Sequence, residues 1–271
     1  AIDDDLAGNA RLKNLADDML DFGTARQAEK DDLAASGQVG DAVRLDRAAP
    51  EGWACWAFSN HDVERHASRW TAGLDTPTRL KFQKLLAGVL LTLRGSVCLY
   101  QGEELGLPEA ELSFEQLVDP AGITFWPRYK GRDGCRTPMQ WNGEKNAGFS
   151  KEGDSEPWLP VHPDYRQCNV GFQRTQPFSL LNVHRELLHL RKEMDCLRRG
   201  SMHLLEGVPE PVVAYSRKGQ GQELRIFMNF SPAPVRFSHS SGKLRFSTSG
   251  ETALEDGYTK LGPWSGLVLE L

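Results

Sequence analysis

An apolar run that ends in an imidazole beside a carboxylate limits the kinds of fold this chain can adopt. The run covers residues 52–58, GWACWAF, and contains no charged side chain. It is rich in aromatic residues and too short for a helix, so it favours a strand buried in a parallel sheet. Asn60, His61 and Asp62 follow at the carboxyl end of this strand, where the reactive groups of parallel α/β folds gather. The sequence therefore predicts an α/β fold with a candidate site at this strand end.

A structural role is the alternative for the same three residues. An asparagine in this setting can form an Asx turn that caps the next helix. The motif by itself leaves both interpretations open.

Helices are predicted on either side of a long segment without periodicity. Residues 76–94 begin with Thr-Pro, carry an apolar stripe and are followed by glycine, which indicates a helix. Residues 177–199 begin with proline, carry a second apolar face and end in two arginines before Gly200. The intervening residues 107–174 are rich in Pro, Gly, Trp and charge. So long a loop is usually functional, for example as a lid.

The pattern changes after Gly200 to short β-type runs separated by Gly, Ser and Pro. Runs at such close spacing are typical of a small antiparallel sandwich. They cover residues 212–215, 224–229, 235–238, 244–246 and 267–271.

Three sequence blocks together resemble one known family. The blocks are residues 59–62 (SNHD), 99–106 (LYQGEELG) and 136–141 (RTPMQW). They are similar, in this order, to the last catalytic strand motif, the final barrel strand and the sugar-covering loop of one group of enzymes. That group is the α-glucosidases and oligo-1,6-glucosidases of glycoside hydrolase family 13, the α-amylase family. The resemblance covers residues 50–271 and corresponds to the C-terminal half of such an enzyme.

The length of the chain limits how much of that fold it can contain. A complete (β/α)8 TIM barrel takes about 250 residues, whereas this chain has 271 and also carries the predicted sandwich. Only two strand–helix units are evident, one near Trp53 and one near Gly95. We expect an α/β part followed by an all-β part, namely the last units of a partial TIM barrel and a C-terminal antiparallel β-sandwich. The expected domains are a poorly matched segment 1–48, a barrel part 49–200 with the long loop 107–176, and the sandwich 201–271.

The resemblance implies retaining hydrolysis of an α-glucosidic bond and assigns roles to particular residues. Asp62 matches the carboxylate that stabilises the transition state through hydrogen bonds to sugar hydroxyls. His61 and Arg136 match substrate-binding residues, and Asn60 and Arg65 are expected to support them. Arg65 follows Asp62 by three residues, so we expect it to orient that carboxylate through a charge-assisted bond. A solvent-facing charge is the alternative for Arg65, and a surface loop arginine is the alternative for Arg136.

The two carboxyl groups that carry out the reaction in this family are not found in the sequence. Retaining enzymes need a nucleophile and a proton donor about 5 Å apart. Residues 36–42, SGQVGDA, faintly resemble the surroundings of the family's proton donor, but Gln38 stands where the acid would be. Glu103 and Glu104 are neighbours in a segment expected to be extended, so they would point to opposite faces and could not serve one bond. We assign both to packing or to a supporting role behind the residues that touch the sugar.

Two kinds of function therefore remain. The first is a part of an α-glucosidase that acts on α-glucosides or short oligosaccharides and is inactive alone. The second is a non-catalytic α-amylase-like binding or interaction protein. Coding sequence before Ala1 with both missing motifs would favour the first. For that enzyme, α-1,4 and α-1,6 linkages, and hydrolysis and glucosyl transfer, stay open.

Composition excludes several other classes of function. A net charge of -5 argues against a nucleic-acid partner, and no stretch is apolar enough for a membrane span or a signal peptide. The five cysteines have no repeated spacing, so we expect no disulfide framework or metal site, reduced thiols and a cytoplasmic location. We expect no cofactor either. An incomplete barrel would leave strand edges uncovered, so self-association is also expected.

Overall fold

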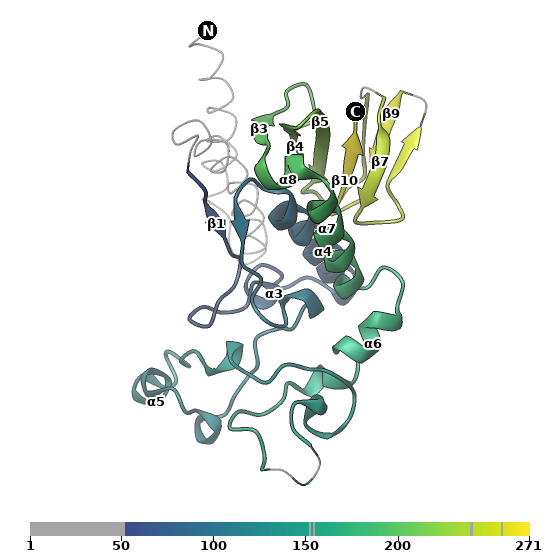
Figure 1. The fold of residues 1–271 in the computed structure, drawn as a ribbon. Helices are drawn as coiled ribbons and strands as arrows, with labels where there is room; N and C mark the ends of the chain where they lie inside the picture. Colours follow the sequence, from purple (N-terminus) through teal and green to yellow (C-terminus); the bar gives the residue numbers. More distant parts are fainter. Residues whose placement is uncertain (1–51, 152, 154, 239–240, 256) are drawn as a thin grey trace. The chain divides into compact units, whose positions relative to one another are not determined.

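The computed structural model describes residues 52–151, 153, 155–238, 241–255 and 257–271 (Figure 1). Its contacts form two compact units, each built from separated stretches of chain. In the described residues, the helix–sheet unit comprises 52–56, 70–96 and 187–271, and the loop unit comprises 57–69 and 97–186. The predicted segment 1–48, with Gln38, lies outside the described residues.

The two predicted barrel strands are present but much shorter than expected. Strands β1 (Cys55–Trp56) and β2 (Ser96–Val97) form a two-stranded sheet, in which the Ser96 amide donates to the Ala54 carbonyl at 2.8 Å. The expected burial is wrong, because Trp53 is 52% exposed. The second strand also ends before residues 99–106, the block that resembles the final barrel strand. The Tyr100 amide bonds the Glu103 carboxylate at 3.3 Å instead of another strand.

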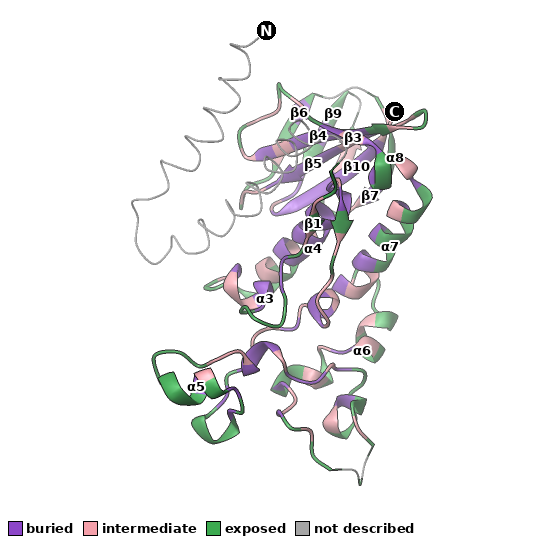
Figure 2. Ribbon diagram, turned by 60° about the vertical axis from the view of Figure 1, so that its left-hand side comes forward, coloured by how far each residue is buried: buried purple, intermediate pink, exposed green. Residues whose placement is uncertain are grey.

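Helix α4 (Thr76–Thr92) confirms the helix predicted from the apolar stripe. The cap is Asp75, whose carboxylate accepts a hydrogen bond from the Thr78 amide at 2.8 Å. Most of the helix after its first turn is buried (Figure 2). It packs on the C-terminal strands so closely that a Cβ at Gly88 would lie 3.0 Å from the Met228 methyl group.

Two arginines, the buried Arg217 and the half-buried Arg191, satisfy the carboxyl end of α4. The last carbonyls of a helix lack intrahelical partners, and here Arg217 donates to the Thr92 carbonyl at 2.6 Å. Arg191 donates to the carbonyls of Leu91 and Leu93 at 2.9 and 3.0 Å. Burial lowers the pKa of Arg217 to about 10, so this guanidinium stays charged at neutral pH. Arg191 also donates to the Gly95 carbonyl and so fixes the chain just before β2.

The C-terminal region forms two antiparallel sheets. One has the strand order β3-β4-β5-β10-β7 and the other β6-β9-β8. The strand bounds are β3 Ser201–Leu204, β4 Val212–Gly219, β5 Gln222–Asn229, β6 Val235–Ser238, β7 Lys243–Ser247, β8 Ala253–Glu255, β9 Tyr258–Leu261 and β10 Ser265–Glu270.

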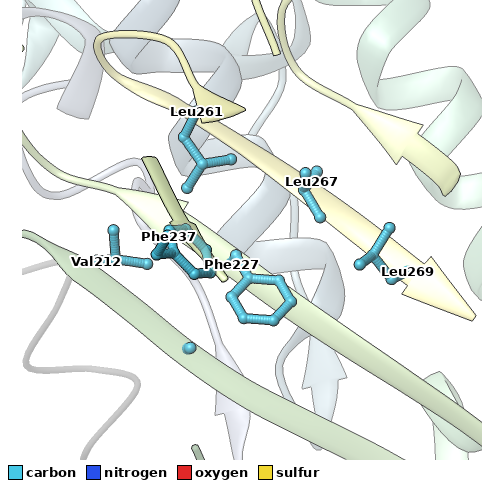
Figure 3. Packing of buried hydrophobic residues seen from close by; sticks show 7 residues of the cluster. Val212, Phe227, Phe237, Leu261, Leu267 and Leu269 are labelled. Carbon is cyan, nitrogen blue, oxygen red and sulfur yellow. The ribbon is translucent and has the colours of Figure 1, made fainter. Parts of the chain in front are cut away.

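A single apolar core joins these two sheets, as expected of the predicted sandwich. Phe227 and Leu267 from the larger sheet meet Phe237 and Leu261 from the smaller one (Figure 3). The Phe227 and Phe237 rings lie 5.3 Å apart. The predicted sandwich is confirmed, although β3, β8 and β9 were not predicted.

Among the described residues of the loop unit, every helix before α7 is short. Helix α7 (Leu180–Glu193) is separated from α8 (Asp195–Arg199) by Met194, so the single helix predicted over 177–199 is wrong in its continuity. The short helices are α3 His66–Arg69, η1 Glu103–Leu105, η2 Phe114–Gln116, α5 Pro120–Phe125, η3 Asp133–Cys135, η4 Lys145–Gly148, η5 Pro163–Arg166 and α6 Val170–Thr175.

Candidate functional site

The predicted site residues begin in a tight turn of the loop unit. The Asn60 side-chain oxygen accepts a hydrogen bond from the Asp62 amide at 2.8 Å, which is the Asx turn that the sequence allowed. Just before it, the buried Ser59 hydroxyl accepts a bond from the His66 amide at 2.9 Å. These two side-chain bonds fix the backbone on either side of His61 and hold Asp62 in place.

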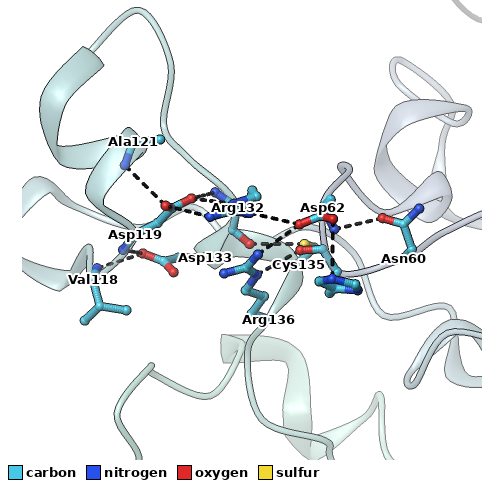
Figure 4. A network of polar contacts seen from close by, with 10 residues as sticks. Asn60, Asp62, Val118, Asp119, Ala121, Arg132, Asp133, Cys135 and Arg136 are labelled. Carbon is cyan, nitrogen blue, oxygen red and sulfur yellow. Dashed lines mark hydrogen bonds and ion pairs between the residues drawn. The ribbon is translucent and has the colours of Figure 1, made fainter.

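The Asp62 carboxylate receives three cationic or polar side chains. Its Oδ1 accepts bonds from Arg132 Nη1 at 3.0 Å and from Arg136 Nη2 at 3.1 Å (Figure 4). Its Oδ2 lies 3.3 Å from His61 Nε2. The side chain remains 50% exposed. The hydrogen bond from Arg132 is the main cause of the lowered pKa of Asp62, so this carboxylate is ionised at neutral pH.

The structure brings His61, Asp62 and Arg136 together. Besides its bond to Asp62, Arg136 donates from Nε to the His61 carbonyl at 2.8 Å. A side chain from the loop is thus joined to both the backbone and the carboxylate of the turn. The guanidinium remains partly exposed, since 23% of the Arg136 side chain is accessible.

The expected bond between Arg65 and Asp62 is a wrong prediction, and so is the solvent-facing alternative. Arg65 is only 2% exposed and donates to the carbonyls of Gln101 and Cys135 at 2.7 and 2.8 Å. Helix α3 begins at His66, so Asp62 and Arg65 do not share a helical face. Arg65 instead holds the loop around Cys135 against the segment after β2.

Tyr100 strengthens the same attachment of the loop. Its hydroxyl donates to the Cys135 carbonyl at 3.0 Å, and the Arg65 guanidinium lies over its ring at 5.0 Å from the centroid. Two donors thus converge on one carbonyl oxygen. This places the segment that carries Arg132 and Arg136 beside the turn.

Arg132 and Asp119 form a part of the site that the sequence did not reveal. Arg132 donates from Nε and Nη2 to the two carboxylate oxygens of Asp119 at 2.9 and 3.1 Å. Asp119 is 3% exposed, and these bonds lower its pKa strongly. The Asp119-Pro120 pair could have been recognised as a helix start, but no sequence signal links it to Arg132.

A second buried aspartate completes the contact between these two segments. Asp133 accepts bonds from the amides of Val118 and Asp119, each at 2.7 Å. In return, Asp119 accepts a bond from the Arg132 amide at 2.9 Å. Each segment therefore supplies a buried carboxylate to the backbone of the other.

A pocket of about 270 Å³ opens beside Asp62 and Arg132 within the loop unit. Its apolar lining includes Leu112, Leu117 and Tyr129. Its other charged side chains are Glu64, Glu109, Glu111 and Lys130. Burial raises the pKa of Glu109 to about 7.

Glu103 and Glu104 lie in a setting different from the one that was expected. Residues 103–105 form the short helix η1, so the premise of an extended segment is wrong. Glu103 is buried, and its pKa is raised to about 8 by that burial. Its Oε2 lies 3.9 Å from His66 Nδ1, whose burial lowers the His66 pKa to about 3. Both groups are mainly neutral near pH 7, so this contact is not an ion pair.

The described residues contain no group of three or more His, Cys, Asp or Glu side chains that could hold a metal ion. None of their helices is both long and apolar enough to cross a membrane. The five cysteines, Cys55, Cys98, Cys135, Cys168 and Cys196, are all free thiols.

Comparison with known proteins gives two family matches. Residues 34–200 match the family described as "Alpha amylase, catalytic domain". Residues 207–268 match a family described as a domain of unknown function, DUF3459. The boundary between the matches falls at the start of the C-terminal sheets.

Similar proteins carry names of α-glucoside-active enzymes. The chain is 52% identical over 170 residues to a probable alpha-glucosidase of Rhizobium meliloti (strain 1021), covering 62% of this chain and 30% of that protein. It is 35% identical over 205 residues to probable oligo-1,6-glucosidase 2 of Bacillus subtilis (strain 168), covering 69% and 36%. A solved alpha-glucosyl transfer enzyme superposes with a TM-score of 0.74 at 40% identity, covering 87% of this chain and 43% of that one. The chain thus spans about a third of these curated relatives.

Proposed function

The chain belongs to the α-amylase family, and from this premise we propose that its loop unit supplies part of the sugar site of a retaining α-glucosidase. The fold class fits that family, with the last units of a TIM barrel followed by antiparallel sheets. The observation that carries the proposal is the convergence of Asp62, His61 and Arg136, joined by bonds of 2.8 and 3.1 Å.

In this proposal Asp62 stabilises the transition state and is neither nucleophile nor acid. It is ionised and half exposed, so it can accept hydrogen bonds from sugar hydroxyls. Such bonds strengthen as positive charge develops at the anomeric carbon and the ring flattens, and they supply several kcal/mol. A carboxyl group with a lowered pKa is a poor proton donor at neutral pH, which argues against an acid role for Asp62.

His61 and Arg136 are proposed to bind hydroxyls next to those held by Asp62. Arg136 presents a planar fork of donors that can bridge vicinal oxygens. Its bond to the His61 carbonyl keeps it at the turn. His61 is largely exposed, with 69% of its side chain accessible, so its ring can turn toward a ligand.

We further propose that this chain does not hydrolyse α-glucosides by itself. The reaction needs a nucleophile and a proton donor in addition to Asp62, and neither motif was identified. The proposed substrates of the whole enzyme are α-glucosides and short oligosaccharides, as the names of the relatives suggest. The free cysteines support a reducing, cytoplasmic location.

Two measurements on the 271-residue chain test this proposal. We expect no release of p-nitrophenol from p-nitrophenyl α-glucoside. We also expect methyl α-glucoside to shift the NMR signals of Asp62 and Arg136 saturably, and Asp62→Asn to abolish the shift at Arg136. Glu255→Gln is the matched control, because Glu255 also pairs with an arginine, Arg236, at 3.0 Å but lies in the C-terminal sheets.

The outcomes separate the two kinds of function. Turnover that disappears in Asp62→Asn would show that this chain contains the missing carboxyl groups. A chain that gives no saturable shift at Asp62 would instead favour a non-catalytic interaction protein.

A further inference from the structure

We propose that Arg132 is a positioning residue that, anchored by Asp119, fixes Oδ1 of Asp62 and so leaves Arg136 available to the sugar. The inference rests on the proposed role of Asp62. It assigns different roles to Arg132 and Arg136, although both donate to the same carboxylate oxygen of Asp62, at 3.0 and 3.1 Å.

The guanidinium group of Arg132 bonds two carboxylates. Nε and Nη2 bond the two oxygens of Asp119, and Nη1 bonds Asp62. All three nitrogens are therefore engaged at once. These three bonds leave from three separate nitrogens of a rigid plane, whereas lysine has all its N–H donors on one nitrogen and could not reach the same three oxygens at once. The side chain has little freedom to follow a moving ligand.

Asp119, which anchors Arg132, is itself held rigidly. Asp119 is buried and caps α5, accepting a bond from the Ala121 amide at 3.2 Å. Its own amide is held by Asp133 at 2.7 Å. A carboxylate with buried, hydrogen-bonded surroundings is costly to move. Arg132 is thus tied to a fixed point.

A pair of glycines allows this close approach. Gly131 has a φ of +77°, and a Cβ there would lie 2.8 Å from Gly122 Cα and 3.0 Å from Asp119 Oδ2. A Cβ at Gly122 would lie 2.6 Å from the Lys130 carbonyl oxygen. Side chains at either position would push Asp119 away from the Arg132 amide.

Arg136 is held in a different way. Its contacts among the described residues are one backbone carbonyl, that of His61, and one carboxylate, that of Asp62. No buried carboxylate within the described part of the chain anchors it. When a sugar arrives, Arg136 can share its donors with hydroxyl groups while Arg132 keeps Oδ1 in place. The Oδ2 atom beside His61 is then the oxygen that accepts from the sugar.

The balance of charges favours the same assignment of roles to Arg132 and Arg136. Asp119 neutralises Arg132, so Asp62 and Arg136 form the remaining pair of opposite charges. Other charged groups around the adjacent pocket are Glu64, Glu109, Glu111 and Lys130.

The test is a pH titration of the Asp62 side-chain carboxyl carbon by NMR in the whole chain. We expect Arg132→Gln to raise the titration midpoint of Asp62. We expect Arg132→Lys to raise it by a comparable amount, because an ammonium keeps the charge but its single nitrogen cannot reach Asp62 Oδ1 while bonding both oxygens of Asp119. Arg136→Lys should raise it less. Arg128→Lys, an exposed arginine of the same loop, is the matched control and should leave it unchanged.

A fourth variant distinguishes the positioning role of Arg132 from a purely electrostatic effect on the titration midpoint of Asp62. Asp119→Asn removes a negative charge near Asp62, which alone would lower the midpoint of Asp62. Loss of the Asp119 anchor would free Arg132 from Asp62 and so raise the midpoint of Asp62. The proposal predicts a rise. Hydrogen exchange at the Val118 amide, which bonds Asp133, reports whether the loop remains folded.

Three results would overturn the inference. One is an unchanged Asp62 midpoint in Arg132→Lys, which would mean that charge alone suffices. Another is a fall of the midpoint in Asp119→Asn with the Val118 amide still protected. The third is a change in midpoint that comes with loss of Val118 protection in all variants, because it would reflect loop unfolding. The titration needs no sugar, so the proposed function can fail separately in the methyl α-glucoside experiment.

Discussion

Substitution of Gly131 by alanine should open the contact between the two loop segments that hold Arg132. Two costs add at this position. A residue with a Cβ pays about 1–2 kcal/mol at positive φ, and Gly131 has a φ of +77°. The new methyl group would also lie 2.8 Å from Gly122 Cα, a close backbone contact for which overpacking costs about 1–3 kcal/mol. Together we expect a loss of about 2–5 kcal/mol in the opening free energy of this contact.

Native-state hydrogen exchange measures that loss directly. The amides of Asp119 and Arg132, which bond the carboxylates across the contact, should exchange at least about 30-fold faster in Gly131→Ala. Gly73→Ala is the matched control, since its φ is +80° but no atom of the described residues lies within 4 Å of a Cβ there. Its reporter is the Leu74 amide, bonded to the Thr71 carbonyl, and we expect only the φ cost of about 1–2 kcal/mol. Equal effects at the two glycines would refute the close-approach argument.

Three further predictions concern the pH dependence of stability and the C-terminal core. The Glu103 pKa is raised from 4.5 to about 8 by burial, so the folded loop unit should lose stability as pH rises from 4.5 to 8, and Glu103→Gln should flatten this part of a pH series of urea unfolding. The His66 pKa is lowered from 6.5 to about 3 by burial, so stability should also fall as pH drops from 6.5 to 3, and a flat profile there would contradict the burial argument. Leu267→Ala should cost about 2–5 kcal/mol in calorimetric unfolding of the sandwich, since Leu267 is fully buried. Leu244→Ala, at a side chain that is 41% exposed, should cost much less, and equal losses would argue against the observed core.

Much of the fold was predictable because short stretches of the sequence contain the features that determine the helices and strands. A proline in the first turn and an apolar stripe located α4, and alternating runs located β4, β5 and β10. Strands such as β3 and β9 were missed because they are short and mix polar with apolar residues. Their positions depend on pairing with β4 and with β6, which is nonlocal information.

The site was predictable only in part, for a similar reason. His61, Asp62 and Arg136 could be named from their motifs, and the structure brings them together. Arg132 and Asp119 could not, because their bond depends on a loop closing through two glycines in a segment without periodicity. The error at Arg65 came from applying helical spacing to residues that precede the first turn of α3.

The most direct test of the central claim is a titration of the chain with methyl α-glucoside, followed at the Asp62 carboxyl carbon and at the arginine Nε–H signals. The account predicts saturable shifts at Asp62 and Arg136, no shift at the Nε–H of Arg132, which stays on Asp119, and loss of all shifts in Asp62→Asn. Saturable binding that persists unchanged in Asp62→Asn, or that shifts Arg132 and leaves Arg136 untouched, would contradict it.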